Sequence, residues 1–183
     1  PFRPRTPAEA IEAGIGCVPE DRKAQGLVLS LTVRENAALA SLGRLTRLGV
    51  VSREAERAAV GAQVDVVGLP ATVLERTTGT LSGGNQQKVV LAKWLLANAD
   101  VLIVDEPTRG GDVGAKVEIH RRLRALAAAG KAILVISSEL PEILAITDRV
   151  VVLREGRVSA EFATSGASPE AILAAALPEG RAA

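Results

Sequence analysis

The sequence predicts an α/β domain built on a parallel sheet, with a helical subdomain inserted into it. Residues 101–104 and 132–136 are short apolar runs of the kind expected for strands buried on both faces, and a helical pattern at 113–129 separates them. Residues 14–18 form another apolar run, which stops at Pro19 and is expected to be the end of a strand. Residues 32–80 show helical patterns and no strand pattern. We therefore expect a helical subdomain at about residues 30–98, and a core portion at residues 8–29 and 99–162.

Local signals place the other elements. Thr32 with Glu35 forms a capping-box pattern for a helix to about residue 41, and Ser52 caps a helix to about residue 67 that Gly68 ends. Glu155-Gly156 is a turn pattern between two strands. The remaining expectations are helices at 8–13, 81–97, 139–146 and 168–176, strands at 149–153 and 157–162, a charged loop at 20–26 and a basic loop at 43–49.

Composition excludes several classes of protein. The 183 residues are 48% hydrophobic, which is enough for a core, and 22 Lys+Arg against 21 Asp+Glu argue against a nucleic-acid-binding protein. Aromatic residues are only 2%. Cys17, the only cysteine, permits no internal disulfide and is expected to be a small core residue. Because no apolar run approaches the roughly 20 residues of a spanning helix, and residues 1–7 lack a signal-peptide pattern, we expect a cytoplasmic protein.

Two acids follow the apolar run at 101–104. Asp105 and Glu106 are expected at the C-terminal end of a parallel strand, where open α/β sheets bind ligands. One carboxylate suits Mg²⁺, directly or through water, and the next could polarise an attacking water. Alone, the pattern is better explained by a strand that simply ends in a solvated turn.

A second motif precedes the helix at 81–97. Gly83 and Gly84 would expose the first backbone N–H groups of that helix, and Ser82 adds a hydroxyl. Together with the helix dipole they make an anion site suited to phosphate. An ordinary capped helix is the alternative, although the pattern has eight residues, Leu81-Ser82-Gly83-Gly84-Asn85-Gln86-Gln87-Lys88.

The two motifs in this order strongly resemble the ABC ATPase family, from about residue 8 to residue 162. Residues 81–87 resemble its signature motif, residues 101–106 its Walker B strand, and Gly111-Asp112 its D-loop. The runs 18–27, 85–88, 107–116 and 137–142 resemble the second nucleotide-binding half of tandem importers for simple sugars, of the ribose, galactose and xylose type. The fold this resemblance implies is a partial P-loop NTPase domain.

Three departures from the family pattern bear on mechanism. No GxxxxGK[ST] occurs, so the Walker A region is missing, and because the sequence also starts without Met we expect it to be cut from a longer chain. Glu20 stands where most members have the Q-loop glutamine, and Ser138 stands where the switch histidine usually lies. A carboxylate cannot donate as an amide does, and a hydroxyl does not titrate near neutral pH.

The resemblance implies that ATP lies between the P-loop of one domain and the signature of another. Ser82, Gly83 and Gly84 would contact the γ-phosphate. Asp105 would help to hold Mg²⁺, and Glu106 would be the catalytic residue that polarises the water. The other nucleotide-site residues implied are Glu20, Gln86, Asp112 and Ser138.

The implied partners are a second nucleotide-binding domain, transmembrane permease subunits and, indirectly, a periplasmic or extracellular sugar-binding protein, with no nucleic acid. The expected location is peripheral, on the cytoplasmic face of the cell membrane. The chain by itself is expected to have negligible ATPase activity. Two alternatives stay open, a degenerate, non-hydrolysing regulatory half and an importer for nucleosides or of the lipoprotein-linked type. Balanced charge and the sugar-type motifs argue against an ABC ATPase acting on DNA or ribosomes.

Overall fold

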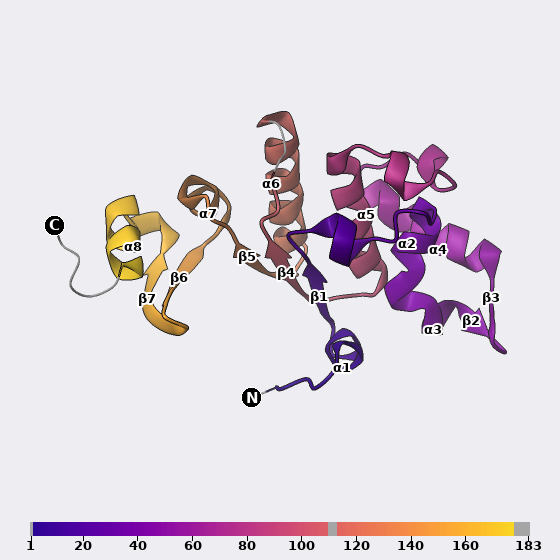
Figure 1. Cartoon of the computed structure of the whole chain (residues 1–183), viewed down its shortest axis with the longest axis horizontal. Helices are drawn as coiled ribbons and strands as arrows, with labels where there is room; N and C mark the ends of the chain where they lie inside the picture. Colours follow the sequence, from indigo (N-terminus) through magenta and orange to yellow (C-terminus); the bar gives the residue numbers. More distant parts are fainter. Residues whose placement is uncertain (1, 110–112, 178–183) are drawn as a thin grey trace. The chain divides into compact units, whose positions relative to one another are not determined.

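A computed structural model describes residues 2–109 and 113–177 of the chain, which form two compact units, Pro1–Ile136 and Ser137–Ala183 (Figure 1). The first unit holds a three-stranded sheet of β1 (Ile15–Val18), β4 (Val101–Asp105) and β5 (Ala132–Ile136), in the order β1-β4-β5. Both pairings are parallel, so the predicted parallel sheet is confirmed. Helix α1 (Pro7–Glu12) leads into β1 and is capped by the Thr6 side chain.

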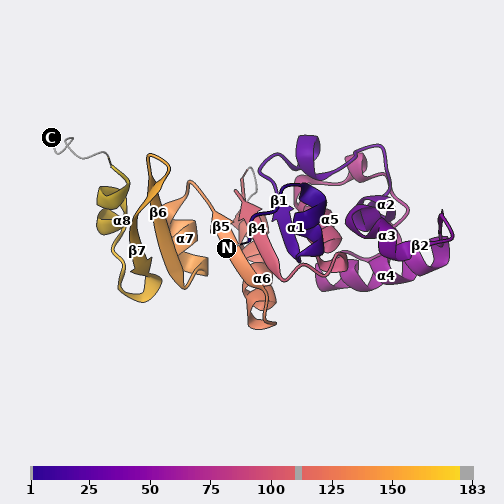
Figure 2. The same ribbon diagram turned by 90° about the horizontal axis from the view of Figure 1, so that it is seen from below.

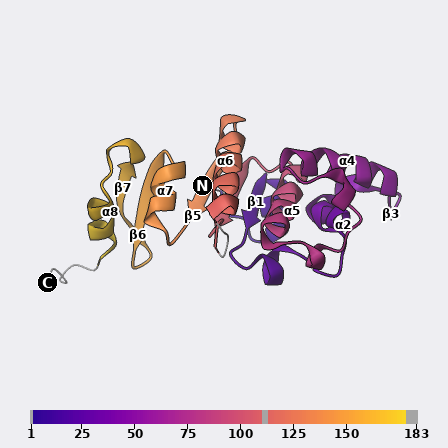
Figure 3. The same ribbon diagram turned by 90° about the horizontal axis from the view of Figure 1, so that it is seen from above.

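One face of this sheet is covered by α5 (Gly83–Leu96), which contacts β1, and by α6 (Val113–Ala128), which contacts β5 (Figures 1 and 3). Leu102 and Val104 of β4 point to that side and are at most 1% exposed. The Trp94 ring of α5 lies directly on Gly16 of β1 and packs against that strand. The sheet and α5 therefore share a core.

The other face of the sheet is open. Cys17, Ile103 and Leu134 lie side by side across the three strands, with Cys17 exposed and Leu134 53% exposed. Ile136 is 48% exposed on the same face. The prediction that both central strands are buried on both faces is therefore wrong, and so is the placement of Cys17 in the core. Alternation along a strand sends every second side chain away from α5 and α6.

Three helices of the first unit pack together, and Figure 2 shows them beside the sheet. They are α2 (Val33–Ala38), which continues as a 3₁₀ turn over Leu39–Ser41, α4 (Arg53–Val66) and α5. The predicted capping box is confirmed, because the Thr32 hydroxyl accepts from the Glu35 N–H while the Glu35 carboxylate accepts from the Thr32 N–H. The predicted Ser52 cap and the end of α4 at Gly68, at φ +66°, are also confirmed.

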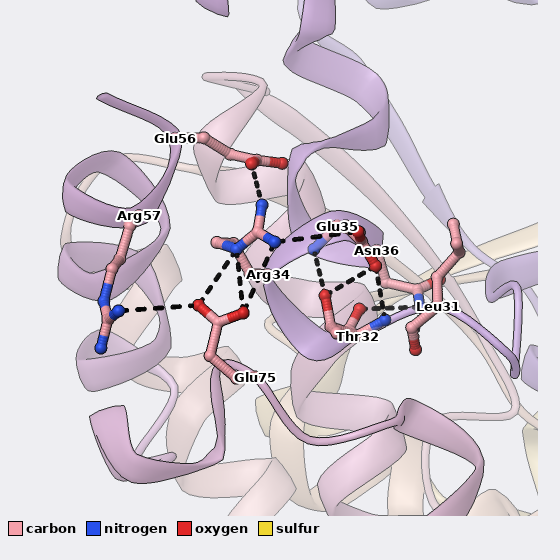
Figure 4. Close-up of polar contacts among 8 residues, drawn as sticks. All are labelled: Leu31, Thr32, Arg34, Glu35, Asn36, Glu56, Arg57 and Glu75. Atoms are coloured by element: carbon pink, nitrogen blue, oxygen red, sulfur yellow. Dashed lines mark hydrogen bonds and ion pairs between the residues drawn. The ribbon is translucent and has the colours of Figure 1, made fainter. Parts of the chain in front are cut away.

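An arginine holds α2 to α4 in this bundle (Figure 4). The Arg34 side chain is buried and pairs with the equally buried Glu56 of α4 and, at 3.2 Å, with Glu75. Arg57 approaches Glu75 from the solvent side at 3.9 Å. Because each buried charge here has an opposite charge beside it, the cluster locks the two helices in one arrangement.

Two predicted loops have regular structure. Residues 43–49, predicted as a basic loop, fall in a helical turn, α3 (Leu42–Leu45), and a hairpin of β2 (Thr46–Arg47) and β3 (Val50–Val51). Leu48 and Gly49 turn this hairpin with positive φ angles, so the segment from 32 to 80 does contain strands. Residues Arg22–Gly26 of the predicted charged loop form a π-helix (η1), capped by the Asp21 carboxylate. Short 3₁₀ turns, η3 (Ala71–Val73) and η4 (Thr78–Thr80), lead to α5.

The second unit contains α7 (Leu140–Ile146), the antiparallel pair β6 (Arg149–Arg154) and β7 (Arg157–Ala163), a 3₁₀ turn (Thr164–Gly166) and α8 (Pro169–Ala176). Its core is Val150, Val152 and Ile172. Glu155 and Gly156 take positive φ angles at the predicted hairpin turn, and Ser168 caps α8 as predicted. In neither unit do the described residues contain a helix long and apolar enough to cross a membrane.

Candidate functional site

Helix α5 begins with an open N-terminal turn. Ser82 is the N-cap residue, is exposed, and makes no capping hydrogen bond with its side chain. Gly83 and Gly84 form the first turn, and no heavy atom outside the local helix lies within 4 Å of a Cβ built on Gly84. The first N–H groups of a helix have no intrahelical acceptors and carry the positive end of the helix dipole. This end of the 14-residue helix α5 is therefore suited to an anion.

A cavity of about 350 Å³ opens at this turn. Its wall combines residues 82–84 of α5 with Pro107, Thr108 and Arg109, which follow β4, and with the first turns of α6. The structure thus brings the Ser-Gly-Gly turn next to the segment that follows Asp105, the predicted metal ligand, and Glu106, the predicted catalytic residue. These stretches are about 25 residues apart in the sequence, and their adjacency was not predictable from spacing alone.

The cavity wall is basic, with four cationic side chains and one carboxylate. That carboxylate, on Glu118, accepts from Lys88 at 2.9 Å and from Arg122 at 2.7 Å. Hydrogen bonds from Lys88 and then Arg122 lower the pKa of Glu118. Even with Glu118 and with Glu20, which pairs with Arg109, the cationic side chains outnumber the carboxylates, and this balance favours a negatively charged ligand.

Asp105 and Glu106 lie at the C-terminal end of β4, as predicted, but neither lines the cavity. Glu106 takes a positive φ of +46° and donates its N–H to the Ile136 carbonyl at 2.8 Å. A left-handed backbone at a residue other than glycine stores strain, which is commonly found where a side chain must be aimed for function. The Asp105 carboxylate is half-buried, and no hydrogen bond or ion pair joins it to another described side chain.

The remaining predicted residues are dispersed. Glu20 is exposed and forms an ion pair with Arg109. Gln86 is 2% exposed, donates to the Thr78 carbonyl at 3.3 Å and does not line the cavity. Ser138 belongs to the second unit, and Asp112, with its neighbour Gly111, lies outside the described residues. Elsewhere, in residues 2–109 and 113–177, no group of three or more His, Cys, Asp or Glu could hold a metal ion by itself.

Sequence reasoning missed several basic residues around α5. Arg22 and Lys88 line the cavity, and Lys93, which is 8% exposed, donates to the Gly26 carbonyl at 2.8 Å. Burial lowers the pKa of Lys93. Charged residues such as Arg121, Arg122 and Arg124 on one helix usually form a solvated face. Arg122 does not, because its side chain is only 18% exposed and donates to the Val66 carbonyl. Helical periodicity could have indicated this, because Arg122 lies three residues after the buried Ile119 and four after Glu118, with which it pairs.

Comparison with known proteins identifies relatives that match nearly the whole chain. A family model described as ABC transporter matches residues 3–109. A ribose import ATP-binding protein of Chromobacterium violaceum is 52% identical over 93% of this chain, and a second one, of Streptomyces coelicolor, is 50% identical over 97%. This chain spans 34% of the length of each, about a third.

Solved structures show the same fold. A dimeric ATP-binding cassette in a post-hydrolysis state, bound to ADP and Pi, matches 82% of this chain and 62% of its own, with a TM-score of 0.68 and 26% identity. A nucleotide-free ATP-binding cassette from an ABC transporter matches 87% of this chain and 64% of its own, with a TM-score of 0.72 and 22% identity. The fold is that of the ABC ATPases within the α/β class, and this chain belongs to the ABC transporter family.

Proposed function

We propose that this chain is part of the ATP-hydrolysing, energy-coupling component of an ABC importer for simple sugars. The single observation that carries the proposal is the basic cavity at the open N-terminal turn of α5, beside the segment that follows Asp105 and Glu106. The names of its relatives, ribose import ATP-binding proteins, support the choice of substrate class.

Ser82, Gly83 and Gly84 bind the terminal phosphate of ATP in this proposal. The nucleotide itself is gripped by a P-loop on a second nucleotide-binding domain, which presents the phosphate to this turn. The uncapped N–H groups of α5 and the free Ser82 hydroxyl donate to the phosphate oxygens. Because the contact forms only when the two domains meet, it favours their closed arrangement.

Asp105 and Glu106 serve this chain's own nucleotide site in the proposal. Asp105 would help to hold Mg²⁺, which neutralises charge on the phosphates, and Glu106 would polarise the hydrolytic water. The chain fits this ion, because Mg²⁺ is usually bound through one or two carboxylates together with phosphate oxygens and waters. The half-buried Asp105 carboxylate offers the first of these ligands.

The other proposed nucleotide contacts are Glu20, Asp112 and Ser138. Gln86 stays a prediction of this kind, although its amide is engaged with Thr78. The division into a helical subdomain at about 30–98 and core portions at 8–29 and 99–162 also belongs to the proposal, with the helical part passing domain closure on to permease subunits. The assembly would work at the cytoplasmic face of the membrane, with a periplasmic or extracellular sugar-binding protein delivering the substrate.

The test compares ATP hydrolysis by the natural protein that carries this chain with its Ser82→Arg and Glu106→Gln variants. A long cation at position 82 would fill the phosphate position, so we expect Ser82→Arg to abolish turnover. Glu106→Gln keeps the size of the side chain and removes its charge. Loss of turnover in both variants supports hydrolysis in this chain's own site. If only Ser82→Arg loses turnover, the chain is a regulatory half that lends its signature turn to its partner. Unchanged turnover with Ser82→Arg would refute the phosphate site itself.

A further inference from the structure

The Arg22 side chain points at the first turn of α5. A Cβ built on Gly83 would lie 2.5 Å from Arg22 Nη2, so the guanidinium lies against the backbone of the glycine turn. Arg22 also lines the basic cavity. Its Nε atom is fully buried and has no hydrogen-bond partner, and no ion pair joins the side chain to another described residue.

Among the described residues, each carboxylate that lines a cavity together with Arg22 is engaged elsewhere. The neighbouring Asp21 accepts from the backbone N–H groups of Lys23 and Ala24 as the cap of η1. Glu20 pairs with Arg109, and Glu118, the one carboxylate of the cavity wall, pairs with Lys88 and Arg122. A guanidinium is always protonated, and a partly buried charge without a partner is costly. Its position beside the positive end of α5 adds to that cost.

A bound anion would remove this cost. Placed in the cavity, it would accept from the guanidinium on one side and from the uncapped N–H groups of α5 on the other. A tetrahedral phosphate matches this arrangement, because arginine presents several N–H donors in one plane to adjacent oxygens.

We infer that Arg22 is a phosphate-binding residue, which completes the anion site of the Ser82–Gly84 turn with a guanidinium. The inference rests on the proposed function, since the phosphate is the terminal group of the nucleotide that the turn receives. Free inorganic phosphate has the same chemistry and is the other source of the ligand. Arg22 thereby makes the affinity for nucleotide depend on η1 as well as on the signature turn.

The test uses Arg22→Gln, Arg22→Lys and Lys23→Gln. Lys23 is the matched control, because it is exposed, lies next to Arg22 in η1 and does not line the cavity. In the natural protein that carries this chain, we expect Arg22→Gln to raise the KM for ATP about tenfold or more, because the substitution removes a hydrogen bond between charged groups. Arg22→Lys keeps the charge and should recover part of this loss, whereas Lys23→Gln should stay within about twofold of wild type.

Urea unfolding of the chain, followed by the fluorescence of Trp94, gives a second measurement without hydrolysis. Without phosphate, Arg22→Gln should unfold at the same or a higher urea concentration than wild type, because the substitution removes an uncompensated charge. With inorganic phosphate at constant ionic strength, wild type and Lys23→Gln should gain stability and Arg22→Gln should not. If Arg22→Gln loses stability without phosphate, the residue is structural and the inference is overturned.

The two measurements distinguish the nucleotide from free phosphate as the ligand. They also distinguish a failure of the inference about Arg22 from a failure of the proposed function. A changed phosphate stabilisation with an unchanged KM for ATP assigns the residue to free phosphate, and a changed KM assigns it to the nucleotide. If Ser82→Arg abolishes turnover while Arg22→Gln matches Lys23→Gln in both measurements, only the inference about Arg22 fails. If Ser82→Arg has no effect, the proposed function fails, whatever Arg22 does.

Discussion

The contact between Gly16 and Trp94 provides a strong test of how α5 is held against the sheet. A Cβ added at Gly16 of β1 would lie 2.9 Å from Trp94 Cδ2 and Cγ, and 3.0 Å from Cε3. Real Cβ atoms do not approach ring carbons this closely, so either the ring or the strand must move. The ring has limited room to move, because Trp94 is only partly exposed and its Nε1 atom is fully buried. Overpacking of this kind costs roughly 1–3 kcal/mol, and we expect Gly16→Ala to lower the free energy of unfolding by that amount.

Gly61→Ala is the matched control. Gly61 lies within α4, and no heavy atom outside the local helix is within 4 Å of its Cβ position. Alanine in a helix interior is favoured over glycine by roughly 0.5–1 kcal/mol, so this variant should be more stable than wild type. The same change of residue is thus expected to act in opposite directions at the two positions.

Urea unfolding measures both effects. Trp94 is the only tryptophan and there is no tyrosine, so the intrinsic fluorescence reports the environment next to Gly16 directly. Circular dichroism at the helix band should give the same midpoints if β1 and α5 unfold together. A Gly16→Ala midpoint equal to or above that of wild type would refute the reasoning that the ring cannot yield. A urea midpoint of Gly61→Ala below that of wild type would show that the empty space at that position does not determine whether alanine raises or lowers the stability.

Two further predictions concern charged clusters. Arg34→Met leaves the Glu56 carboxylate, 4% exposed, without its partner and should cost about 3–5 kcal/mol of stability, whereas Arg57→Met, whose side chain is 65% exposed, should cost less than about 1 kcal/mol. Equal losses in calorimetry would contradict the buried-pair explanation, and Arg34→Met combined with Glu56→Leu should recover much of the loss. Hydrogen bonds from Lys88 and Arg122 hold the pKa of Glu118 below its ordinary value of 4.5, so this group's stabilisation is complete above that pH and is lost as pH falls through the folded-state pKa. The urea midpoints of wild type and Glu118→Gln should therefore converge in acid below about pH 4.5, and a difference that stays constant with pH would exclude this linkage.

Local chemistry made the helix ends predictable from the sequence. Caps such as Thr32 with Glu35 depend on residues three apart, and the chain ends α4 at Gly68 and turns after α6 at Gly130 because both glycines adopt positive φ. The hairpin of β2 and β3 was missed because each strand has only two residues. A two-residue strand leaves no alternation to detect, and its turn uses Leu48, which is not a usual residue at positive φ.

Burial was less predictable, because it depends on neighbours far along the chain. An apolar run of β-branched residues indicates a strand, but it does not say whether one or two layers cover it. The sequence placed Leu102 and Leu134 in the same class, yet one is fully buried and the other is 53% exposed. The same limit applies to Arg22, since its lack of a partner follows from where Glu20 and Asp21 find theirs.

The site also depends on how α5 is fixed. Trp94 rests on Gly16 of β1, Lys93 donates to the Gly26 carbonyl at the end of η1, and Arg22 at the start of η1 lies against Gly83. These three contacts join α5 to one continuous stretch of chain, residues 16–26. One contact is at the first residue of α5, Gly83, and the other two are near its C-terminal end, at Lys93 and Trp94. Because Glu20 lies within that stretch, we expect a displacement of the segment around Glu20 to move α5 through these contacts, one of which is made by β1 of the sheet. The position of the first turn of α5 therefore depends on residues 16–26 as well as on Ser82, Gly83 and Gly84.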